Sequence, residues 1–299
     1  MSDDFYREGC AWIDGDYLPI SEARIPIVDS GFSRSDVTYD VVAVWNRKFF
    51  RLDDHLARFK SSWSRLRMSP PVSPDVMREI LFECVRRSGL ENAYVDMIMS
   101  RGTPPPGVRD PRRFVNRFYA YAIPYVWIVP PADQEVGTHL VVCRDTVRIS
   151  PQSVDPTIKN FQWGDLVRGM FEAYDRGGTW PVLVDAGGYL TEGPGFNLFV
   201  VYEGKLITPD RGVLEGITRR TVLELAAEMG IPAQLERFRA DLLHRADELF
   251  ITSTAGGVMP ITVLDDQRVG DGKPGAITMA LRQRYWDAHD DPRWATPVE

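Results

Sequence analysis

A proline-punctuated stretch at residues 124–131 divides the chain into two halves, and both halves mix strand patterns with helix patterns. Together with Ala-Asp-Gln-Glu at 132–135, which follows it, this stretch is typical of a linker. The pattern predicts an α+β protein with an N-terminal domain at 1–123, a linker at 124–136 and a C-terminal domain at 137–299. With 299 residues, of which 44% are hydrophobic, the chain is long enough to bury a core in each domain.

The N-terminal half is predicted to begin with two β-hairpins. Asp14-Gly15 lies between apolar arms within residues 10–20, which is a strong signal for a tight hairpin turn. A second hairpin is expected over 37–52, with its turn at 46–47.

Two helices and two strands are expected to follow. Asp53 or Asp54 is expected to cap a helix with one apolar stripe, formed by Leu56, Phe59, Trp63 and Leu66. A second helix is predicted from Ser73-Pro74 to Gly89, with an inner face formed by Val76, Ile80 and Cys84. Strands are predicted at 93–100 and 114–122.

The C-terminal half shows the same mixture of elements. The clearest helix pattern covers 217–229, where apolar residues recur at the spacing of one helical face: Val222, Leu225, Ala226 and Met229. Further helices are predicted at 161–174 and 240–245. Strands are predicted at 138–143, 180–185, 197–202 and 248–252.

Composition excludes several classes of function. The net charge of −7 argues against a basic surface that holds nucleic acid. No apolar run is long enough to span a bilayer and the N-terminus has no signal-peptide pattern, so we expect a cytoplasmic protein without a membrane partner. Three widely spaced cysteines predict no disulfide framework, and four scattered histidines predict no metal site.

One lysine stands out by elimination. The chain has only five lysines, and four of them lie at turns, in loops or on the polar side of a helix. Lys159 instead lies among apolar and neutral residues, where partial desolvation would lower the pKa of its amine and make it nucleophilic. The same surroundings also suit a lysine that snorkels from a strand end.

Three further segments carry groups suited to ligand binding. Glu192 lies in a glycine-rich bend directly before a strand. Gly216 precedes the helix at 217–229, whose first turn holds Thr218 and offers backbone N–H groups to an anion. The small residues at 253–257 would let a ligand approach the backbone closely. Each segment alone is equally compatible with a plain turn or helix cap.

Taken together, these segments resemble the fold-type-IV family of pyridoxal-phosphate enzymes, which includes branched-chain, D-amino-acid and (R)-selective amine transaminases. The resemblance covers about residues 10–285. Five stretches match in the family's order: 51–58, 158–160, 191–199, 214–219 and 253–257. The stretches at 35–45 and 161–173 look most similar to the (R)-selective amine transaminases.

The resemblance implies a cofactor site for pyridoxal 5′-phosphate. Lys159 would hold the cofactor covalently and move the proton at the substrate carbon. Glu192 would face the pyridine nitrogen and keep it protonated. The phosphate would be bound by four residues: Arg58, Ile217, Thr218 and Thr254. His55 lies one turn before Arg58, and the sequence assigns it no role.

For the substrates, the resemblance implies a pocket that accepts an amine and a keto acid in turn. Its matched residues are Tyr39, Val41, Tyr94, Trp163 and Ala255, each of which also suits plain core packing. Arg109 matches a loop arginine thought to pair with a keto-acid carboxylate, although three preceding prolines stiffen its loop.

The expected activity is a ping-pong transaminase that takes nitrogen from an (R)-amine or D-amino acid and gives it to a keto acid such as pyruvate. The alternatives are a branched-chain L-amino-acid transaminase, an aminodeoxychorismate lyase and a non-enzymatic small-molecule binding protein. The family further implies a homodimer with shared active sites. Whether the residues after about Tyr285 form a mobile tail is left open by the sequence.

Overall fold

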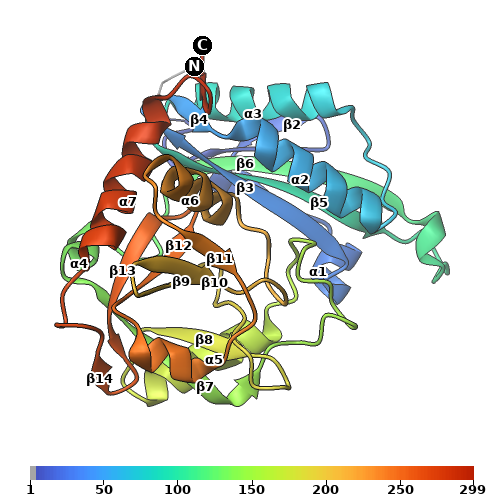
Figure 1. The fold of residues 1–299 in the computed structure, drawn as a ribbon. Helices are drawn as coiled ribbons and strands as arrows, with labels where there is room; N and C mark the ends of the chain where they lie inside the picture. Colours follow the sequence, from blue (N-terminus) through green and yellow to red (C-terminus); the bar gives the residue numbers. More distant parts are fainter. Residues whose placement is uncertain (1–4) are drawn as a thin grey trace. The chain divides into compact units, whose positions relative to one another are not determined.

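The computed structural model describes residues 5–299, so the first four residues of the predicted N-terminal domain lie outside the description. Two compact units account for the chain (Figure 1). The first contains residues up to 126 together with 158–161 and 289–299, and the second contains 127–157 and 162–288. Residues 158–161 and 289–299 therefore belong to the first unit, although they follow residues of the second unit in the sequence. Each predicted domain, by contrast, is one continuous stretch of the chain.

The first unit is built on a seven-stranded antiparallel sheet with the order β15-β4-β3-β5-β6-β1-β2. Its strands are β1 (Cys10–Ile13), β2 (Asp16–Pro19), β3 (Val37–Trp45), β4 (Lys48–Phe50), β5 (Ala93–Thr103), β6 (Val115–Pro124) and β15 (Ala295–Pro297). Both predicted hairpins are present, because Asp14 and Asn46 adopt the positive φ that such tight turns require. Since β15 pairs with β4, the end of the chain is an ordered edge strand.

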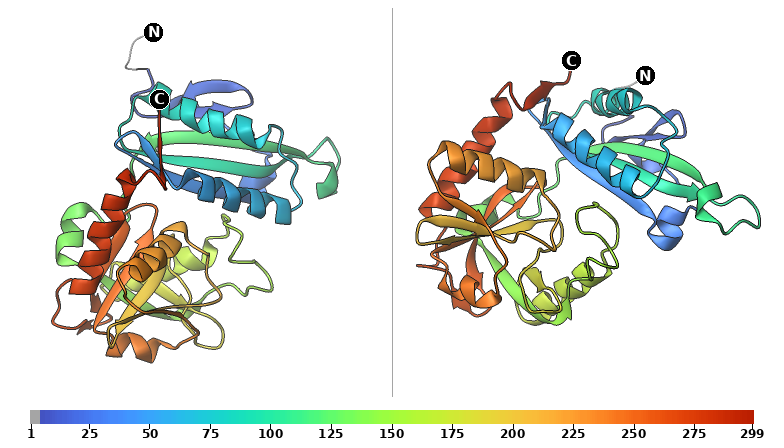
Figure 2. Two further views of the ribbon diagram at one scale, coloured as in Figure 1. Left: turned by 45° about the horizontal axis from the view of Figure 1, so that its top comes forward. Right: turned by 45° about the vertical axis from the view of Figure 1, so that its right-hand side comes forward.

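Two helices cover one face of this sheet, α2 (Leu52–Arg65) and α3 (Pro74–Ser88) (Figures 1 and 2). Their apolar residues, among them Phe59 and Leu81, pack against the sheet residues Val42, Val95 and Met97 in one buried core. Along each strand, every second side chain points toward these helices.

Two details of these helices correct the sequence prediction. Helix α2 is preceded by Arg51 in a left-handed conformation, so Asp53 and Asp54 lie in its first turn, where their charge favours the helix N-terminus, and neither caps it. Val76 is 46% exposed, although it was predicted on the inner face of α3. Met77 is buried in its place, so the first residue of the inner face of α3 lies one position later than predicted. Four short elements complete the unit: η1 (Ile20–Glu22), α1 (Ser30–Arg34), η2 (Pro111–Arg113) and η4 (Ala288–Asp290). The first residue of η4 still belongs to the second unit, because the final segment of the first unit is 289–299.

The second unit contains an eight-stranded mixed sheet with the order β11-β10-β9-β12-β13-β7-β8, and β14 pairs with β13 beside this path. Its strands are β7 (Thr138–Val147), β8 (Trp180–Val184), β9 (Asn197–Tyr202), β10 (Lys205–Thr208), β11 (Ala233–Leu235), β12 (Glu248–Ser253), β13 (Gly257–Leu264) and β14 (Gln267–Arg268). Strands β9, β12 and β13 are almost entirely buried, which explains their continuous apolar runs.

Four α-helices accompany this sheet (Figure 2). They are α4 (Pro131–Val136), α5 (Gly164–Asp175), α6 (Ile217–Glu228) and α7 (Ala276–Asp287). Helix α4 occupies the end of the predicted linker. Helix α5 begins at Gly164, three residues after its predicted start, and residues 240–245 form a 3₁₀ helix, η3 (Ala240–Arg245).

Candidate active site

The segment that carries Lys159 is held against strand β3 in the first unit. Asn160 forms a β-bridge with Thr38, and the carbonyl oxygen of Lys159 accepts hydrogen bonds from the Thr38 hydroxyl (2.6 Å) and the Tyr39 N–H (3.2 Å). The backbone of Lys159 is therefore fixed to β3. Its Nζ lies 4.3 Å from the centre of the Tyr39 ring, which is within the range of a cation–π contact.

Three predicted substrate residues share one face of the first unit's sheet. In the pairing of β3 with β5, Val41 is opposite Asp96 and Ala43 is opposite Tyr94, so these side chains point to the same side. Tyr39 lies two residues before Val41 and joins them. This side is opposite to the core formed with α2 and α3. We refer to Tyr39, Val41, Tyr94, Asp96 and Tyr121 as the tyrosine face.

Asp96 is a member of this face that the sequence analysis missed. It is buried, and one of its carboxyl oxygens, Oδ2, accepts a hydrogen bond from the Tyr121 hydroxyl at 2.9 Å. The other, Oδ1, has no hydrogen-bond partner among the described residues. Burial raises the pKa of this carboxyl group to about 8, against the opposing effects of Tyr121 and Lys159. The one available sequence signal was an acid inside an otherwise apolar strand.

Arg58 belongs to a buried cluster on the helix-covered face of the same sheet. Its Nε and Nη2 donate to the two carboxyl oxygens of Asp40 at 2.7 and 2.8 Å, which is a bidentate ion pair. His55 Nδ1 lies 2.8 Å from Asp40 Oδ1. The carboxylate of Asp40 thus fixes the orientation of the arginine predicted to bind phosphate.

The ion pair between Asp40 and Arg58 determines which groups of this cluster are charged. Burial alone would raise the pKa of Asp40, but the charge of Arg58 and the hydrogen bonds from His55 and Arg58 outweigh it and hold this pKa below its usual range. Burial lowers the pKa of His55, so its ring is neutral at neutral pH and its Nδ1 carries the proton that the carboxylate accepts. His55 thus supports Arg58 through Asp40.

Glu192 lies in the second unit, in a bend of fixed geometry. Its Oε1 accepts a hydrogen bond from Arg148 Nη2 at 3.1 Å, and its Oε2 accepts one from the Leu214 N–H at 2.8 Å. Arg148 also pairs with Asp165 at 2.7 Å and was not singled out by the sequence. At Gly193 a Cβ would lie 2.1 Å from the Phe196 ring, so only glycine fits this bend.

The remaining predicted cofactor residues lie at two backbone turns of the second unit. Gly216 is the N-cap of α6 and has no side chain to cap it, and the following Ile217 and Thr218 are both buried. Thr254 and Ala255 form the turn between β12 and β13. These turns share one neighbour: the Tyr285 hydroxyl lies 3.5 Å from Thr218 Oγ1, and its ring closely approaches Gly257.

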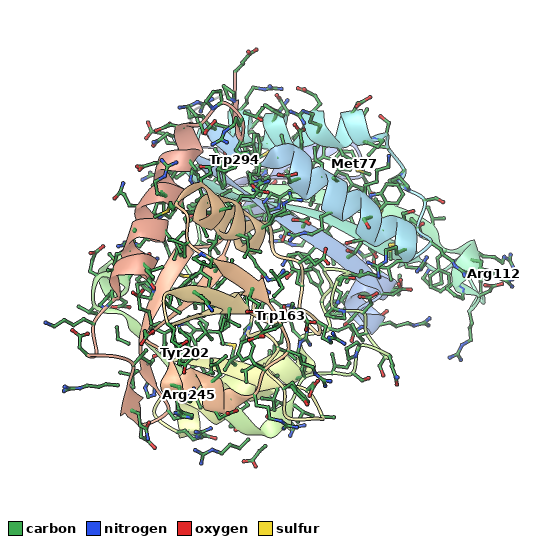
Figure 3. The ribbon with its side chains drawn as sticks, in the orientation of Figure 1. Met77, Arg112, Trp163, Tyr202, Arg245 and Trp294 are labelled. Atoms are coloured by element: carbon green, nitrogen blue, oxygen red, sulfur yellow. The ribbon has the colours of Figure 1, made fainter. Side chains whose placement is uncertain are left out.

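Trp163 and Arg109 occupy different kinds of position. Trp163, which is labelled in Figure 3, lies directly before α5. A Cβ on Gly195 would lie 3.5 Å from its ring, so Trp163 borders the bend that follows Glu192. Arg109 is exposed in the connection between β5 and β6. Arg112, which is labelled in Figure 3, belongs to the same connection. No described contact joins Arg109 to Lys159.

Each unit carries polar groups of its own that suit ligand binding. The first unit contains an amine and an arginine, Lys159 and Arg58. The second contains a carboxylate and a helix N-terminus with a hydroxyl, Glu192 and Thr218. These are groups of the kinds that a phosphorylated, electron-accepting cofactor needs. Among residues 5–299 no group of histidine, cysteine, aspartate and glutamate is arranged to hold a metal ion. Nor does any helix in that range have the length and apolar character to cross a membrane.

Comparison with known proteins identifies the family. The class IV aminotransferase family model matches residues 38–264. A putative branched-chain-amino-acid aminotransferase of Methanocaldococcus jannaschii is 29% identical over 291 residues, covering 96% of this chain and 98% of that protein. The branched-chain-amino-acid aminotransferase of Pseudomonas aeruginosa is 28% identical over 291 residues, covering 94% and 93%.

Solved structures agree with this result. The branched-chain amino acid aminotransferase from Thermobaculum terrenum, in its PLP-bound holo form, has a TM-score of 0.87 and 26% identity, covering 99% of this chain and 100% of that one. The chain belongs to the class IV aminotransferases, which are pyridoxal-phosphate enzymes of fold type IV. The predicted fold class and cofactor are confirmed. These relatives are named for branched-chain substrates, which fits the alternative of the sequence analysis better than its (R)-amine expectation.

Proposed function

We propose that this transaminase takes its amino group from an (R)-amine or a D-amino acid and passes it to a keto acid such as pyruvate in a ping-pong cycle. The observation that carries the proposal is the composition of the tyrosine face beside Lys159. This face combines three tyrosines with a small valine and a buried acid, Asp96, and contributes no cation of its own.

Charge on this face favours a donor without a carboxylate there. A substrate carboxylate directed at the tyrosine face would lose its hydration and gain no guanidinium partner from the residues of this face, which disfavours a charged substituent there. An aryl or alkyl substituent would instead contact the rings of Tyr39 and Tyr94. The resemblance of residues 35–45 and 161–173 to (R)-selective amine transaminases also supports this donor class.

We assign the chemical steps to residues as follows. When bound, pyridoxal 5′-phosphate supplies an electron sink for the reacting carbon. Lys159 would hold this group through Nζ and would move the proton at the substrate carbon, because its fixed backbone keeps the amine nearby. Glu192, held by Arg148 and Leu214, would keep the ring nitrogen protonated.

Phosphate binding is assigned to the four residues that the family resemblance implies. Arg58 contributes a guanidinium that Asp40 orients. In the second unit Ile217 and Thr218 contribute the N-terminus of α6, and Thr254 contributes its turn. A Glu192→Gln change should reduce turnover more than cofactor affinity, since the carboxylate acts on the ring nitrogen while the phosphate ligands remain. Turnover and the apparent cofactor affinity, measured on the same variant, check this expectation.

The keto acid needs a binding group away from the tyrosine face. Arg109 is our candidate, because it is exposed in the β5–β6 connection and presents a planar donor fork suited to carboxylates. Trp163 and Ala255 are proposed as further substrate contacts. We also propose a homodimer that completes each site, which light scattering of the purified enzyme would test.

A second candidate is a branched-chain L-amino-acid transaminase, favoured by the names of the relatives. A panel of donors separates the two: (R)-1-phenylethylamine, (S)-1-phenylethylamine, D-alanine and L-leucine, each with pyruvate or 2-oxoglutarate. We expect the (R)-amine to be the preferred donor with pyruvate. Preference for L-leucine would establish the second candidate, and release of pyruvate from aminodeoxychorismate without any keto acid would indicate a lyase.

A further inference from the structure

The turn that carries Thr254 and Ala255 depends on support from outside itself. Its next two residues, Gly256 and Gly257, have φ angles of +143° and +72°, which residues with a side chain rarely adopt. Two consecutive glycines give a turn little rigidity of its own. Within the turn, the Ala255 N–H donates to Ser253 Oγ at 3.2 Å. The rest of the support must come from neighbouring elements.

The segment that leads into α4 supplies this support within the second unit. The Ile128 N–H donates to the Ala255 carbonyl oxygen at 2.8 Å. The next residue, Val129, is buried in the core of this unit, and its carbonyl oxygen accepts a hydrogen bond from Gln134 Nε2 at 2.8 Å. The same Nε2 lies 3.5 Å from the carbonyl oxygen of Gly256, at the long end of the hydrogen-bonding range. Gln134 therefore contacts the turn and also fixes the backbone beside Ile128.

A glutamine at this position is not explained by packing. The side chain of Gln134 is fully buried, and its Oε1 has no hydrogen-bond partner among the described residues. A buried acceptor without a partner costs free energy that a leucine or methionine in its place would avoid. What an apolar side chain lacks is a donor for the two carbonyl oxygens, so Nε2 is the group that distinguishes this residue.

Holding these carbonyl oxygens fixes the direction of the turn. In a planar trans peptide, the carbonyl and the following N–H point in opposite directions. The carbonyls of Ala255 and Gly256 face the segment of Ile128 and Gln134, so the peptide N–H groups that follow them face away from it. Thr254 directly precedes these two peptides, and its orientation depends on the same contacts.

We propose that Gln134 is a positioning residue, which holds the turn at 253–257 in the geometry that lets Thr254 bind the cofactor phosphate. The inference rests on the proposed function in one respect, the assignment of Thr254 to the phosphate. It goes further by naming the residue that keeps this turn in place, in a segment that the sequence analysis treated as a linker. Gln134 is fully buried and acts on the ligand through the turn.

The test compares pyridoxal 5′-phosphate with pyridoxal, which lacks the phosphate. The full-length holoenzyme is reconstituted with each ligand and diluted in steps, and the absorbance of the bound ring gives both dissociation constants. Both aldehydes have the same group for attachment to Lys159, so the pyridoxal constant divided by the pyridoxal 5′-phosphate constant measures the contribution of the phosphate. In Gln134→Met, which keeps the length of the side chain but removes the donor, this ratio should fall about tenfold.

Glu135→Gln is the matched control. It removes the charge that pairs Glu135 with Arg282 on the surface of α4, and it leaves every contact between Gln134 and the turn in place. The ratio should therefore keep its wild-type value. A fall as large as that in Gln134→Met would mean that any loosening of α4 weakens phosphate binding, and it would overturn the specific role of Gln134.

Gln134→Glu is the conservative variant, and it keeps the proposal testable if Gln134→Met does not fold. A protonated carboxyl group can donate to a carbonyl oxygen, whereas a carboxylate cannot, and burial favours the protonated form. Relative to wild type at the same pH, the ratio should be restored at about pH 6 and lowered at about pH 9. A purely structural role predicts no such rescue.

Two results would overturn the inference: a wild-type ratio in Gln134→Met, or a ratio in Gln134→Glu that does not depend on pH relative to wild type. Thr254→Ala tests the underlying assignment separately, because an unchanged ratio there would remove Thr254 from the phosphate site and the inference with it. If Thr254→Ala lowers the ratio and Gln134→Met does not, the phosphate assignment stands and the role of Gln134 alone fails.

Discussion

The two faces of the first unit's sheet treat a buried aspartate in opposite ways. Asp40 on β3 points toward the helices, where Arg58 and His55 satisfy it and hold its pKa below the usual range. Asp96 on the neighbouring β5 points to the other face, keeps one oxygen unpartnered and has a pKa raised to about 8. Two similarly buried carboxyl groups therefore differ in charge at neutral pH: Asp40 is ionised and Asp96 is protonated. The hydrogen-bond and charge partners of each group cause this difference.

The contrast between these two residues lies in how completely each carboxyl group is hydrogen-bonded. The Asp40 cluster is complete in itself and serves to orient Arg58. Asp96 accepts a hydrogen bond from Tyr121 at Oδ2, and its Oδ1 has no hydrogen-bond partner among the described residues. Lys159 lies on the side of Asp96, where its positive charge partly offsets the burial of the acid.

Asp40→Asn should give the largest effect. It removes the carboxylate charge and leaves the guanidinium of Arg58 without its counterion in a buried setting, which costs about 3–5 kcal/mol of unfolding free energy. Urea denaturation at neutral pH would measure the loss. A loss below about 1 kcal/mol would mean that the pair is weakly coupled to folding and that the two acids differ less than their contacts suggest.

Asp96→Asn should change stability with the opposite sign, raising it by about 1–4 kcal/mol at neutral pH. The folded-state pKa of Asp96 exceeds its unfolded value, so the folded protein binds the extra proton, and stability falls as pH rises from about 4 to about 8. In Asp96→Asn the free energy of unfolding should not show this fall between about pH 4 and about pH 8. Denaturation curves at several pH values check the prediction, and an identical slope in both proteins would refute it.

Tyr121→Phe should give the smallest effect, a loss of about 1 kcal/mol, since one hydrogen bond to Asp96 disappears and no new charge is exposed. The loss should grow above about pH 8, where the carboxylate is ionised and needs its donor more. Parallel denaturation of Tyr121→Phe in the Asp96→Asn background provides the control, because the pH dependence should then vanish. A loss that does not depend on pH would mean that Tyr121 contributes packing alone.

Local patterns were sufficient to predict most elements that lie near the site. The hairpin at β3 and β4 and helix α6 follow from turn residues and apolar spacing, and Gly216 lies at the expected helix start. Glu192 could be singled out because glycines surround it, and one of them, Gly193, is required by close packing.

Long-range pairing explains what the sequence could not predict. Residues 158–161 join β3 through a bridge between Asn160 and Thr38, and β15 pairs with β4 from the far end of the chain. Neither contact has a periodic signal. The role of Asp96 depends on which strands lie beside β5, so its lack of a partner becomes visible only in the folded sheet.

Covalent attachment of the cofactor to Lys159 is the step on which the proposed chemistry depends most directly. Borohydride reduction of the purified enzyme, followed by digestion and mass spectrometry, locates the attached group. We expect the phosphopyridoxyl mass on the peptide that contains Lys159, and its absence from a Lys159→Ala variant. The mass on another of the five lysines, or on none, would contradict this assignment.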